Sequence, residues 1–231
     1  MNIALITAGG VGARMHREIP KQFLNVYDKP VIIYTLEAFQ KHPNIDAIVV
    51  VCLEGWEPIL RAYCQQYHIT KLESIVLGGL NGQDSIRNGV YDIASRHADD
   101  DLILIHDAIR PMITHDIISD CIHVATKYGS AIASIPCMEA MLTTTDKISS
   151  NAQIPRSELM RAQTPQAASV KRLTEAHREA LEKGITSSVA TCTMLIELGQ
   201  EVYFSLGSEK NIKLTTPDDL EIFKALLSVK S

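Results

Sequence analysis

The stretch of sequence that decides the fold is NIALITAGGVGARM, residues 2–15, in which an apolar run passes directly into a glycine-rich turn. The run at residues 2–7 has a continuous apolar centre, which is typical of a short strand buried on both faces of a sheet. Glycines after such a strand let backbone N–H groups approach phosphate oxygens closely. This stretch therefore predicts a buried strand whose carboxyl end leads into an anion-binding turn.

Basic residues lie in and just after this turn. Arg14 and Lys21, the latter within Pro20-Lys21-Gln22, could neutralise phosphate charge that backbone amides alone cannot. The turn is not a Walker A loop, because Gly-Lys-Ser/Thr is absent, nor a dinucleotide fingerprint, because Met15 replaces the third glycine. A purely structural turn is the alternative, but the basic pair favours a triphosphate site. Its candidate backbone ligands are Ala8, Gly9, Gly10 and Gly12.

Further short apolar runs alternate with longer helical patterns along the chain. The runs lie at residues 46–53, 73–77, 102–106 and 130–136, and the helical patterns at 30–42, 56–67, 84–98 and 114–128. This alternation is typical of a mostly parallel sheet with helices on both faces, because parallel strands need right-handed crossover connections. The length of 231 residues suits one domain, residues 1–231. The predicted fold class is α/β, a three-layer sandwich.

Residues 137–163 interrupt the alternation. The segment is polar at its centre, residues 143–146, and holds Arg156 and Arg161 in its second half. It is too long for an ordinary connection. We therefore expect a β-arm or long hairpin that leaves the core, although a flexible surface loop would produce the same pattern.

Composition and charge restrict the class of protein. Apolar residues make up 46% of the chain and the formal net charge is −5, so neither nucleic acid nor a membrane is an expected partner. The five cysteines are scattered and include no C-x-x-C pair, which argues against a zinc site or a disulfide framework. The first residues lack a basic region followed by a long apolar stretch, so we expect a cytoplasmic protein.

An acidic residue follows one of the predicted strands. Asp107 comes directly after the run at 102–106, and ligands bind at this end of strands in open α/β sheets. A lone carboxylate there could hold Mg²⁺, which keeps several waters and bridges phosphates. Capping of the next turn is the alternative role.

Two more stretches carry candidate site residues. The small residues at 78–85 could seat a base and a ribose through Gly82 and Ser85, or could only cap a helix. Lys213 lies directly before a final helix marked by Thr216 and Pro217, and could face phosphate or only solvent.

Together these stretches resemble a known family. The residues that carry the resemblance are AGGxGxRM (8–15), PKQ (20–22), HDAxRP (106–111), QTPQ (163–166) and NIKxTxP (211–217). The combination is similar to that of the CTP:alditol-phosphate cytidylyltransferases, whose best-known members act on 2-C-methyl-D-erythritol 4-phosphate and ribitol 5-phosphate. It implies a Rossmann-like nucleotidyltransferase fold, in which a phosphate oxygen of the acceptor attacks the α-phosphorus of CTP and pyrophosphate leaves.

The resemblance also implies roles for the candidate residues. Arg14, Lys21 and Lys213 would be catalytic, because they would stabilise charge on the reacting phosphates. Asp107 would hold Mg²⁺, the expected cofactor, and Gly82 and Ser85 would contact the cytidine. The polyol phosphate would be bound by Asp107, Arg110, Arg156 and Thr164. Arg156 would reach the site of a partner subunit on the arm 137–163, which implies a homodimer.

The chain departs from the family pattern on the acceptor side. Glu139-Ala140 stands where members usually have Asp-Thr, and Ser188 stands where they have Asp. Three other stretches, Phe23-Leu24, Gly55-Trp56 and residues 110–114, resemble the ribitol 5-phosphate branch more closely. Ribitol 5-phosphate or a related alditol phosphate is therefore the expected acceptor, and 2-C-methyl-D-erythritol 4-phosphate is the alternative.

Two alternatives come from other classes of protein. The first is a nucleotide-binding regulator that has lost catalysis, but Arg14, Lys21, Asp107 and Lys213 are all present. The second is a nicotinamide dehydrogenase, and the missing third glycine argues against it.

Overall fold

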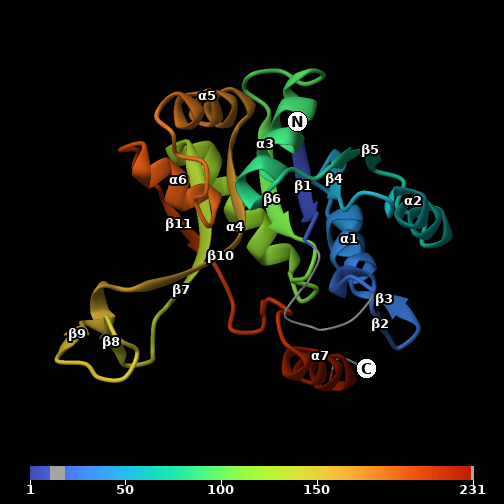
Figure 1. Cartoon of the computed structure of the whole chain (residues 1–231). Helices are drawn as coiled ribbons and strands as arrows, with labels where there is room; N and C mark the ends of the chain where they lie inside the picture. Colours follow the sequence, from blue (N-terminus) through green and yellow to red (C-terminus); the bar gives the residue numbers. More distant parts are fainter. Residues whose placement is uncertain (11–18, 230–231) are drawn as a thin grey trace.

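The computed structural model describes residues 1–10 and 19–229 and has a seven-stranded sheet of strand order β11-β7-β10-β6-β1-β4-β5 (Figure 1). The strands are β1 (Asn2–Ala8), β4 (Ala47–Cys52), β5 (Leu72–Leu77), β6 (Leu102–Asp107), β7 (Ser130–Pro136), β10 (Met160–Ser169) and β11 (Phe204–Leu206). Neighbouring strands are parallel except for β10, which runs antiparallel to β6 and β7. The mostly parallel sheet predicted from the sequence is confirmed.

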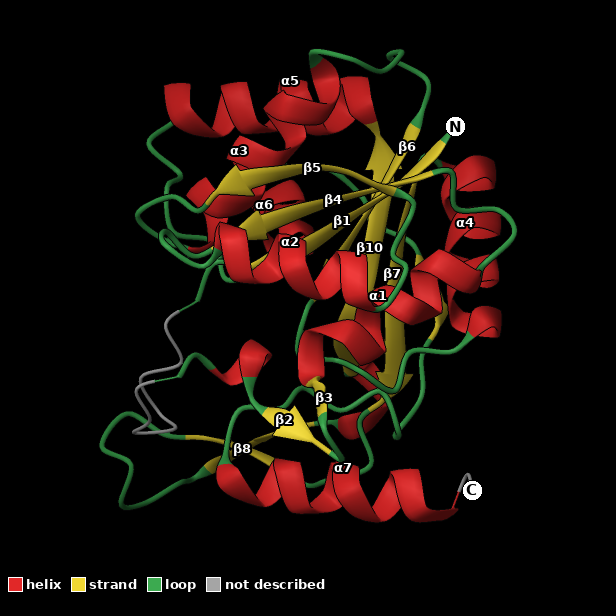
Figure 2. Ribbon diagram, turned by 90° about the vertical axis from the view of Figure 1, so that its right-hand side faces the viewer, coloured by secondary structure: helices red, strands yellow, loops and turns green. Residues whose placement is uncertain are grey.

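Strand side chains alternate between the two faces of the sheet, and helices cover both faces. The helices that do so are α1 (Val31–Lys41), α2 (Glu57–Gln66), α3 (Gly82–Ala94), α4 (His115–Tyr128) and α5 (Val170–Glu182). Ile3 and Leu5 of β1 belong to the core under α3 and α5, whereas Ala4 and Ile6 belong to the core under α1, α2 and α4. Figure 2 shows the strands β1, β4 and β5 between these layers. Among the helices of the described ranges, none is long and apolar enough to span a membrane.

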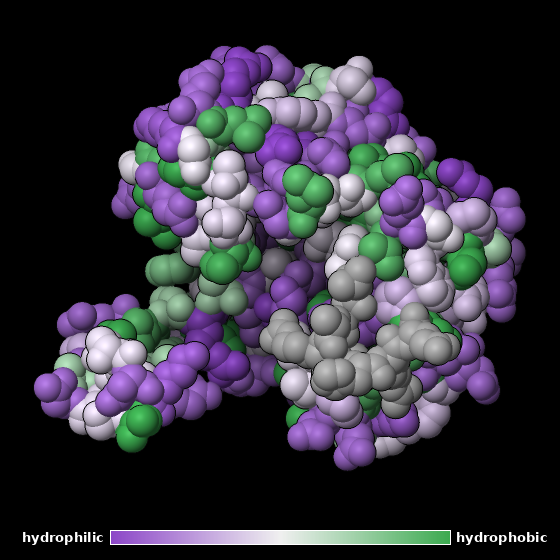
Figure 3. Space-filling view, in the orientation of Figure 1, coloured by the Kyte–Doolittle hydropathy of each residue, from purple (hydrophilic) through white to green (hydrophobic). Residues whose placement is uncertain are grey.

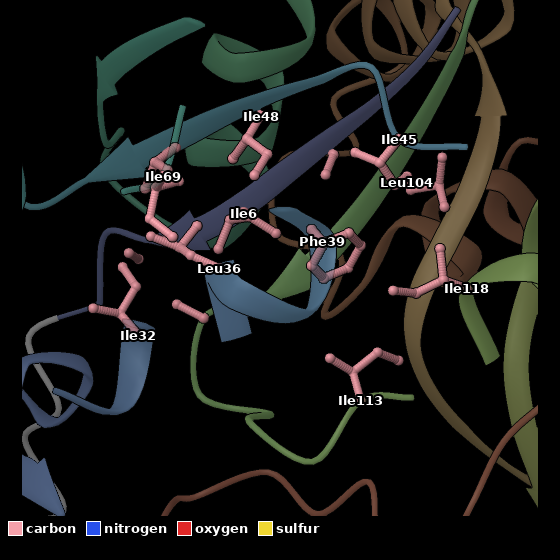
Figure 4. Close-up of a cluster of buried hydrophobic side chains, with 14 of the residues drawn as sticks. Ile6, Ile32, Leu36, Phe39, Ile45, Ile48, Ile69, Leu104, Ile113 and Ile118 are labelled. Carbon is pink, nitrogen blue, oxygen red and sulfur yellow. The ribbon is translucent and has the colours of Figure 1, made fainter. Parts of the chain in front are cut away.

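The larger core lies between the sheet and α1 (Figure 4). Leu36 and Phe39 of α1 pack with Ile6, Ile48 and Leu104 from three neighbouring strands, and all five side chains are fully buried. Burying one such side chain contributes about 1.5–3 kcal/mol. This core holds the strand ends rigidly, and the site is built on those ends.

The C-terminal part of the chain returns to the carboxyl end of the sheet. Helix α6 (Thr191–Glu197) and β11 are followed by α7 (Pro217–Val229), which packs against the small hairpin of β2 (Asn25–Val26) and β3 (Lys29–Pro30). Leu220 and Phe223 of α7 share one buried cluster with Val26, Ile109 and Leu214. This packing brings the loop before α7 to the end of β6.

The predicted arm is present, with a different boundary. Two short strands, β8 (Met141–Thr143) and β9 (Ala152–Ile154), form a two-stranded sheet of their own that stands away from the body (Figures 1 and 3). A short turn, η3 (Arg156–Glu158), leads back, and the Cys137 N–H donates to the Leu159 carbonyl where the arm closes. The predicted segment 137–163 therefore extends beyond the arm, because residues 160–162 already pair with β7 as part of β10.

Candidate active site

The carboxyl ends of the parallel strands open into a cleft of about 500 Å³. Ala8 ends β1, Leu53 follows β4, Gly79 follows β5 and Asp107 ends β6, and all four line the cleft. Crevices at this end of an open α/β sheet are the usual ligand sites. Of the site residues predicted from the sequence, the cleft is lined by Ala8, Gly9, Gly10, Lys21, Gly82, Ser85, Asp107 and Lys213.

The start of the glycine-rich turn is held by Gln22. Its side-chain amide donates to the carbonyl oxygens of Ala8 (2.7 Å) and Gly10 (3.1 Å). Gln22 lies in the 3₁₀ turn η2 (Lys21–Phe23), so the same bonds fix the backbone that carries Lys21 at the wall of the cleft. A buried amide of this kind has no periodic signature, and only its place in the PKQ motif marked it.

Two predicted residues of the same turn, Gly12 and Arg14, lie outside the described residues. Their expected contacts with the triphosphate therefore stay predictions.

The loop between β5 and α3 approaches the glycine-rich turn closely. A Cβ added to Gly9 would lie 3.4 Å from Ser85 Oγ, and one added to Gly79 would clash with Asp84. The Ser85 hydroxyl donates to the Asn81 carbonyl (2.8 Å) and accepts from the Gly79 N–H (3.0 Å). Ser85 therefore lines the cleft as predicted, but its hydrogen bonds in this structure stabilise the loop itself.

Asp107 is the centre of a small charge network. Its Oδ1 accepts from Lys213 Nζ (3.0 Å) and its Oδ2 from Arg110 Nε (2.9 Å). Burial alone would raise the pKa of the Asp107 carboxyl, but the charges of Lys213 and Arg110 outweigh burial and hold this pKa at about 2. Arg110 also donates to the Asn211 carbonyl (2.7 Å). The result is an ionised carboxylate fixed between two cations at the edge of the cleft.

A buried histidine supports this network. His106 is completely buried, and its two ring nitrogens contact Thr164 Oγ1 (Nδ1, 3.0 Å) and the Arg110 carbonyl (Nε2, 3.2 Å). Thr164 Oγ1 also accepts from the Asp107 N–H (3.1 Å). Burial lowers the pKa of His106 to about 4, against the opposing charge of Asp107. The imidazole is therefore neutral at physiological pH.

Amide side chains fix the loop that carries Lys213. Gln163 of β10 donates to the Ser208 carbonyl (2.9 Å) and accepts from the Ser208 N–H (3.2 Å). Asn211 is fully buried, and its side-chain nitrogen donates to the Thr164 carbonyl (2.8 Å). Sequence reasoning did not identify Gln163 or Asn211 as site residues, although both fall within motifs that carried the resemblance.

A second pocket of about 260 Å³ adjoins the cleft. Thr164 and Arg110 line it, and it shares Asp107 and Lys213 with the cleft. Arg156 is not brought to either cavity. It lies exposed on the arm, where its Nη1 donates a long hydrogen bond to the Met138 carbonyl (3.5 Å).

Comparison with known proteins identifies the family. The model of the 2-C-methyl-D-erythritol 4-phosphate cytidylyltransferase family, IspD, matches residues 2–229. The chain belongs to this family. It is 44% identical over 232 residues to a protein of Lacticaseibacillus paracasei named ribitol-5-phosphate cytidylyltransferase, which covers 100% of this chain and 99% of the relative.

Other relatives carry the second family name. The chain is 38% identical over 227 residues to a 2-C-methyl-D-erythritol 4-phosphate cytidylyltransferase of Clostridium botulinum, which covers 98% and 97% of the two chains. The crystal structure of the Francisella tularensis 2-C-methyl-D-erythritol 4-phosphate cytidylyltransferase superposes with a TM-score of 0.81 at 26% identity, covering 97% and 98% of the chains. The fold expected from the resemblance is therefore confirmed, and this member of the family is a nucleotidyltransferase.

The positions at which this cytidylyltransferase departs from the family pattern can now be located. The Ser188 N–H donates to Gln83 Oε1 (2.8 Å) and its hydroxyl to Glu197 (3.0 Å), at the rim of the nucleotide-sized cleft. Glu139 is exposed at the base of the arm and accepts from Arg161 (3.4 Å). The hydrogen bonds of these two side chains thus go to Arg161 and Glu197, whereas Asp107 pairs with Lys213 and Arg110.

Proposed function

We propose that this cytidylyltransferase joins CTP to ribitol 5-phosphate or a closely related alditol phosphate and releases pyrophosphate. The observation that carries the proposal is the cleft in which Lys21, Asp107 and Lys213 surround the glycine-rich turn. The 44% identity to a ribitol-5-phosphate cytidylyltransferase exceeds the 38% identity to a 2-C-methyl-D-erythritol 4-phosphate enzyme, which favours ribitol 5-phosphate. The description of the matching family model favours the second acceptor, which is therefore the alternative.

The reaction is a nucleotidyl transfer without a covalent enzyme intermediate. An oxygen of the acceptor phosphate attacks the α-phosphorus of CTP in line. The bond from the α-phosphorus to the bridging oxygen breaks, and pyrophosphate leaves with the electron pair. The protein contributes position and charge. Lys21 and Lys213 stabilise the charge of the phosphates, and Arg14 is expected to act beside Lys21.

The two adjoining cavities support a division between the two substrates. We assign CTP to the larger cleft, with Gly82 and Ser85 near its cytidine, and the acceptor to the pocket lined by Arg110 and Thr164. The cavities share Asp107 and Lys213. The reacting phosphates would meet where these side chains lie.

Mg²⁺ is part of the proposal, and the residues present fit it. Mg²⁺ commonly binds through one or two carboxylates together with substrate phosphates. The Asp107 carboxylate is 17% exposed at the edge of the cleft and stays ionised, because Lys213 and Arg110 hold its pKa at about 2 despite burial. Among the described residues no cluster of three or more metal-binding side chains exists, so phosphate oxygens and water would supply the other ligands. The ion would neutralise charge on the phosphates.

Replacing Asp107 tests its role toward the metal. In Asp107→Asn we expect the Mg²⁺ concentration for half-maximal activity to rise at least about tenfold, because an amide is a weaker ligand for a hard cation. The control is Asp219→Asn, because that carboxylate accepts from the backbone N–H groups of Thr215 and Thr216 instead. Saturation at the parent's Mg²⁺ concentration in Asp107→Asn would remove Asp107 from the metal site.

The acceptor is tested by a pyrophosphate-release assay with CTP. Ribitol 5-phosphate, 2-C-methyl-D-erythritol 4-phosphate and other polyol phosphates are compared by kcat/KM, and UTP replaces CTP in a parallel series. We expect the highest value with ribitol 5-phosphate and a strong preference for CTP. A higher value with 2-C-methyl-D-erythritol 4-phosphate would establish the alternative acceptor. Absence of pyrophosphate release with every acceptor would favour the catalytically inactive regulator.

A homodimer with composite sites completes the proposal. Arg156 lies on the arm and contacts neither cavity of its own chain. An arginine fork suits a phosphate, since it can donate two parallel hydrogen bonds. We propose that Arg156 reaches the acceptor pocket of a partner subunit.

A further inference from the structure

The orientation of one hydroxyl group in the acceptor pocket follows from its neighbours. Thr164 is half-buried and lines the pocket that we assign to the acceptor. A threonine hydroxyl has one hydrogen to donate and two lone pairs that accept. Two of these three hydrogen-bonding positions are occupied in the structure, one by His106 Nδ1 and one by the Asp107 N–H.

The tautomer of His106 can be assigned from its contacts. Its Nε2 lies 3.2 Å from the Arg110 carbonyl oxygen, which can only accept, so Nε2 carries the hydrogen. The ring is fully buried and both its nitrogens face uncharged oxygen atoms, so it carries this one hydrogen and its Nδ1 accepts. The Thr164 hydroxyl, 3.0 Å away, must donate to it.

Among the described residues, the remaining hydrogen-bonding capacity of the Thr164 hydroxyl is therefore a single acceptor position. Its hydrogen is engaged by His106, and one lone pair accepts from the Asp107 N–H (3.1 Å). The free lone pair is the part of the hydroxyl that remains for a ligand. An alcohol of the substrate can donate to it, whereas a phosphate oxygen, which only accepts, cannot. Turning the hydroxyl toward a phosphate would leave His106 Nδ1 without a partner in a fully buried position.

We propose that His106 is a positioning residue that holds Thr164 as a hydrogen-bond acceptor, so that Thr164 recognises a hydroxyl group of the acceptor substrate and not its phosphate. The resemblance to the family implied only that Thr164 helps to bind the polyol phosphate. The proposal deepens the proposed function and rests on it. It makes a polyol chain, rather than a phosphate alone, a requirement of this pocket.

The experiment combines Thr164 variants with substrate analogues. KM and kcat are measured with CTP for ribitol 5-phosphate and for its four analogues that each lack one hydroxyl group. In the parent, one deoxy analogue should show a KM about tenfold higher, the effect of one lost hydrogen bond. In Thr164→Val the KM for ribitol 5-phosphate should rise by a similar factor. The KM for the sensitive deoxy analogue should be the same in Thr164→Val as in the parent. Thr164→Ser should resemble the parent.

His106 is tested through the same readout. His106→Leu removes the acceptor at Nδ1, whereas in His106→Asn the Oδ1 atom stands close to that position. We expect His106→Asn to keep the selectivity against the deoxy analogue better than His106→Leu, with the KM for CTP unchanged in both. The control is His177→Leu, because His177 is also buried but its ring nitrogens have no hydrogen-bond partner among the described residues.

Each outcome separates the inference from the proposed function. If Thr164→Val raises the KM equally for ribitol 5-phosphate and for all four analogues, Thr164 does not recognise a hydroxyl and the inference is wrong. The proposed function would survive that result. If His106→Leu does not fold, the comparison of Thr164→Val with the analogues still decides the matter. If the parent releases no pyrophosphate with any polyol phosphate, the proposed function fails and the inference fails with it.

Discussion

Two buried histidines have opposite surroundings. His106 has a partner at each ring nitrogen, whereas His177 of α5 has none among the described residues. Burial lowers the pKa of His177 to about 4 from 6.5, helped by the charge of Arg87. Between these two pKa values, the imidazole of His177 therefore binds a proton in the unfolded chain but not in the folded chain. This proton does not affect the free energy of unfolding while the pH is above the pKa of His177 in the unfolded chain. As the pH falls below that pKa, the free energy of unfolding decreases.

Removing His177 should flatten the pH dependence of stability. In the parent we expect the free energy of unfolding to fall by roughly 2 kcal/mol between pH 7.5 and 5 because of His177 alone. In His177→Leu this part of the loss should disappear, with little change at pH 7.5, because no hydrogen bond is removed. Urea unfolding at both pH values measures the difference. An equal loss in parent and variant would mean that His177 is protonated in the folded state.

Much of the site was predictable at the scale of single residues, for a physical reason. Asp107 and the glycine-rich turn follow buried strands, and the ends of parallel strands converge in space. The pairing of Asp107 with Lys213 could not be read locally, because 106 positions separate them. Gln22 and Asn211 lie in motifs that carried the resemblance but had no predicted role, because a buried amide is defined by its partners, which only the fold supplies.

Among the elements, the turn η2 is too short to hold Lys21 without support. A 3₁₀ turn of three residues has weak internal hydrogen bonds, and η2 has no side-chain cap. Besides Gln22, its support is Phe23, whose ring stacks on Trp56 with centroids 4.6 Å apart. Two of the three stretches that resemble the ribitol 5-phosphate branch, those with Phe23 and Trp56, are therefore in contact in space.

This contact should affect catalysis through Lys21. Trp56→Ala is expected to lower kcat about tenfold, because a small misplacement of a charge at the reacting centre is costly. Trp56→Phe should keep most of the activity. The control is Tyr203→Ala, which removes the equally close stack of Tyr128 and Tyr203 (4.8 Å) on α4 and the segment before β11.

A double-mutant cycle identifies the route of the effect. If Trp56 acts by positioning Lys21, then Trp56→Ala should cost little further activity in a Lys21→Ala chain, itself reduced roughly a hundredfold. If Trp56→Ala lowers kcat in the Lys21→Ala chain by the same factor as in the parent, Trp56 does not act through Lys21.

Strand β10 is one of the elements that the sequence did not predict. Its stretch MRAQTPQAAS, residues 160–169, mixes polar residues with Pro165, and proline is unusual inside a sheet. The register with β7 shifts between Ala162 and Gln166, so neither regular alternation nor a continuous apolar run marks the strand. Strands β4, β5, β6 and β7 each contain a short apolar run, and that pattern was sufficient to predict them.

At the scale of the whole molecule, the arm is the part that lacks a core of its own. An isolated two-stranded hairpin is at best marginally stable in water. The arm nevertheless exposes large apolar side chains, with Leu142 at 63% and Ile148 at 90% exposure. A second subunit that covers this surface would account for both features. The sequence predicted the arm from its length but could not give its direction, which only the three-dimensional fold defines.

The composite site is tested by mixing two inactive chains, Arg156→Ala and Asp107→Ala. If Arg156 acts in the partner's site, a mixed dimer has one site with both defects and one site with neither. Random exchange should then restore roughly a quarter of the parent activity, because half of the dimers are mixed and each has one intact site. As control, Arg156→Ala is mixed with a chain that carries both substitutions, which cannot form an intact site. If the subunits exchange, as followed by a tag on one chain, and no activity returns, Arg156 does not act in trans.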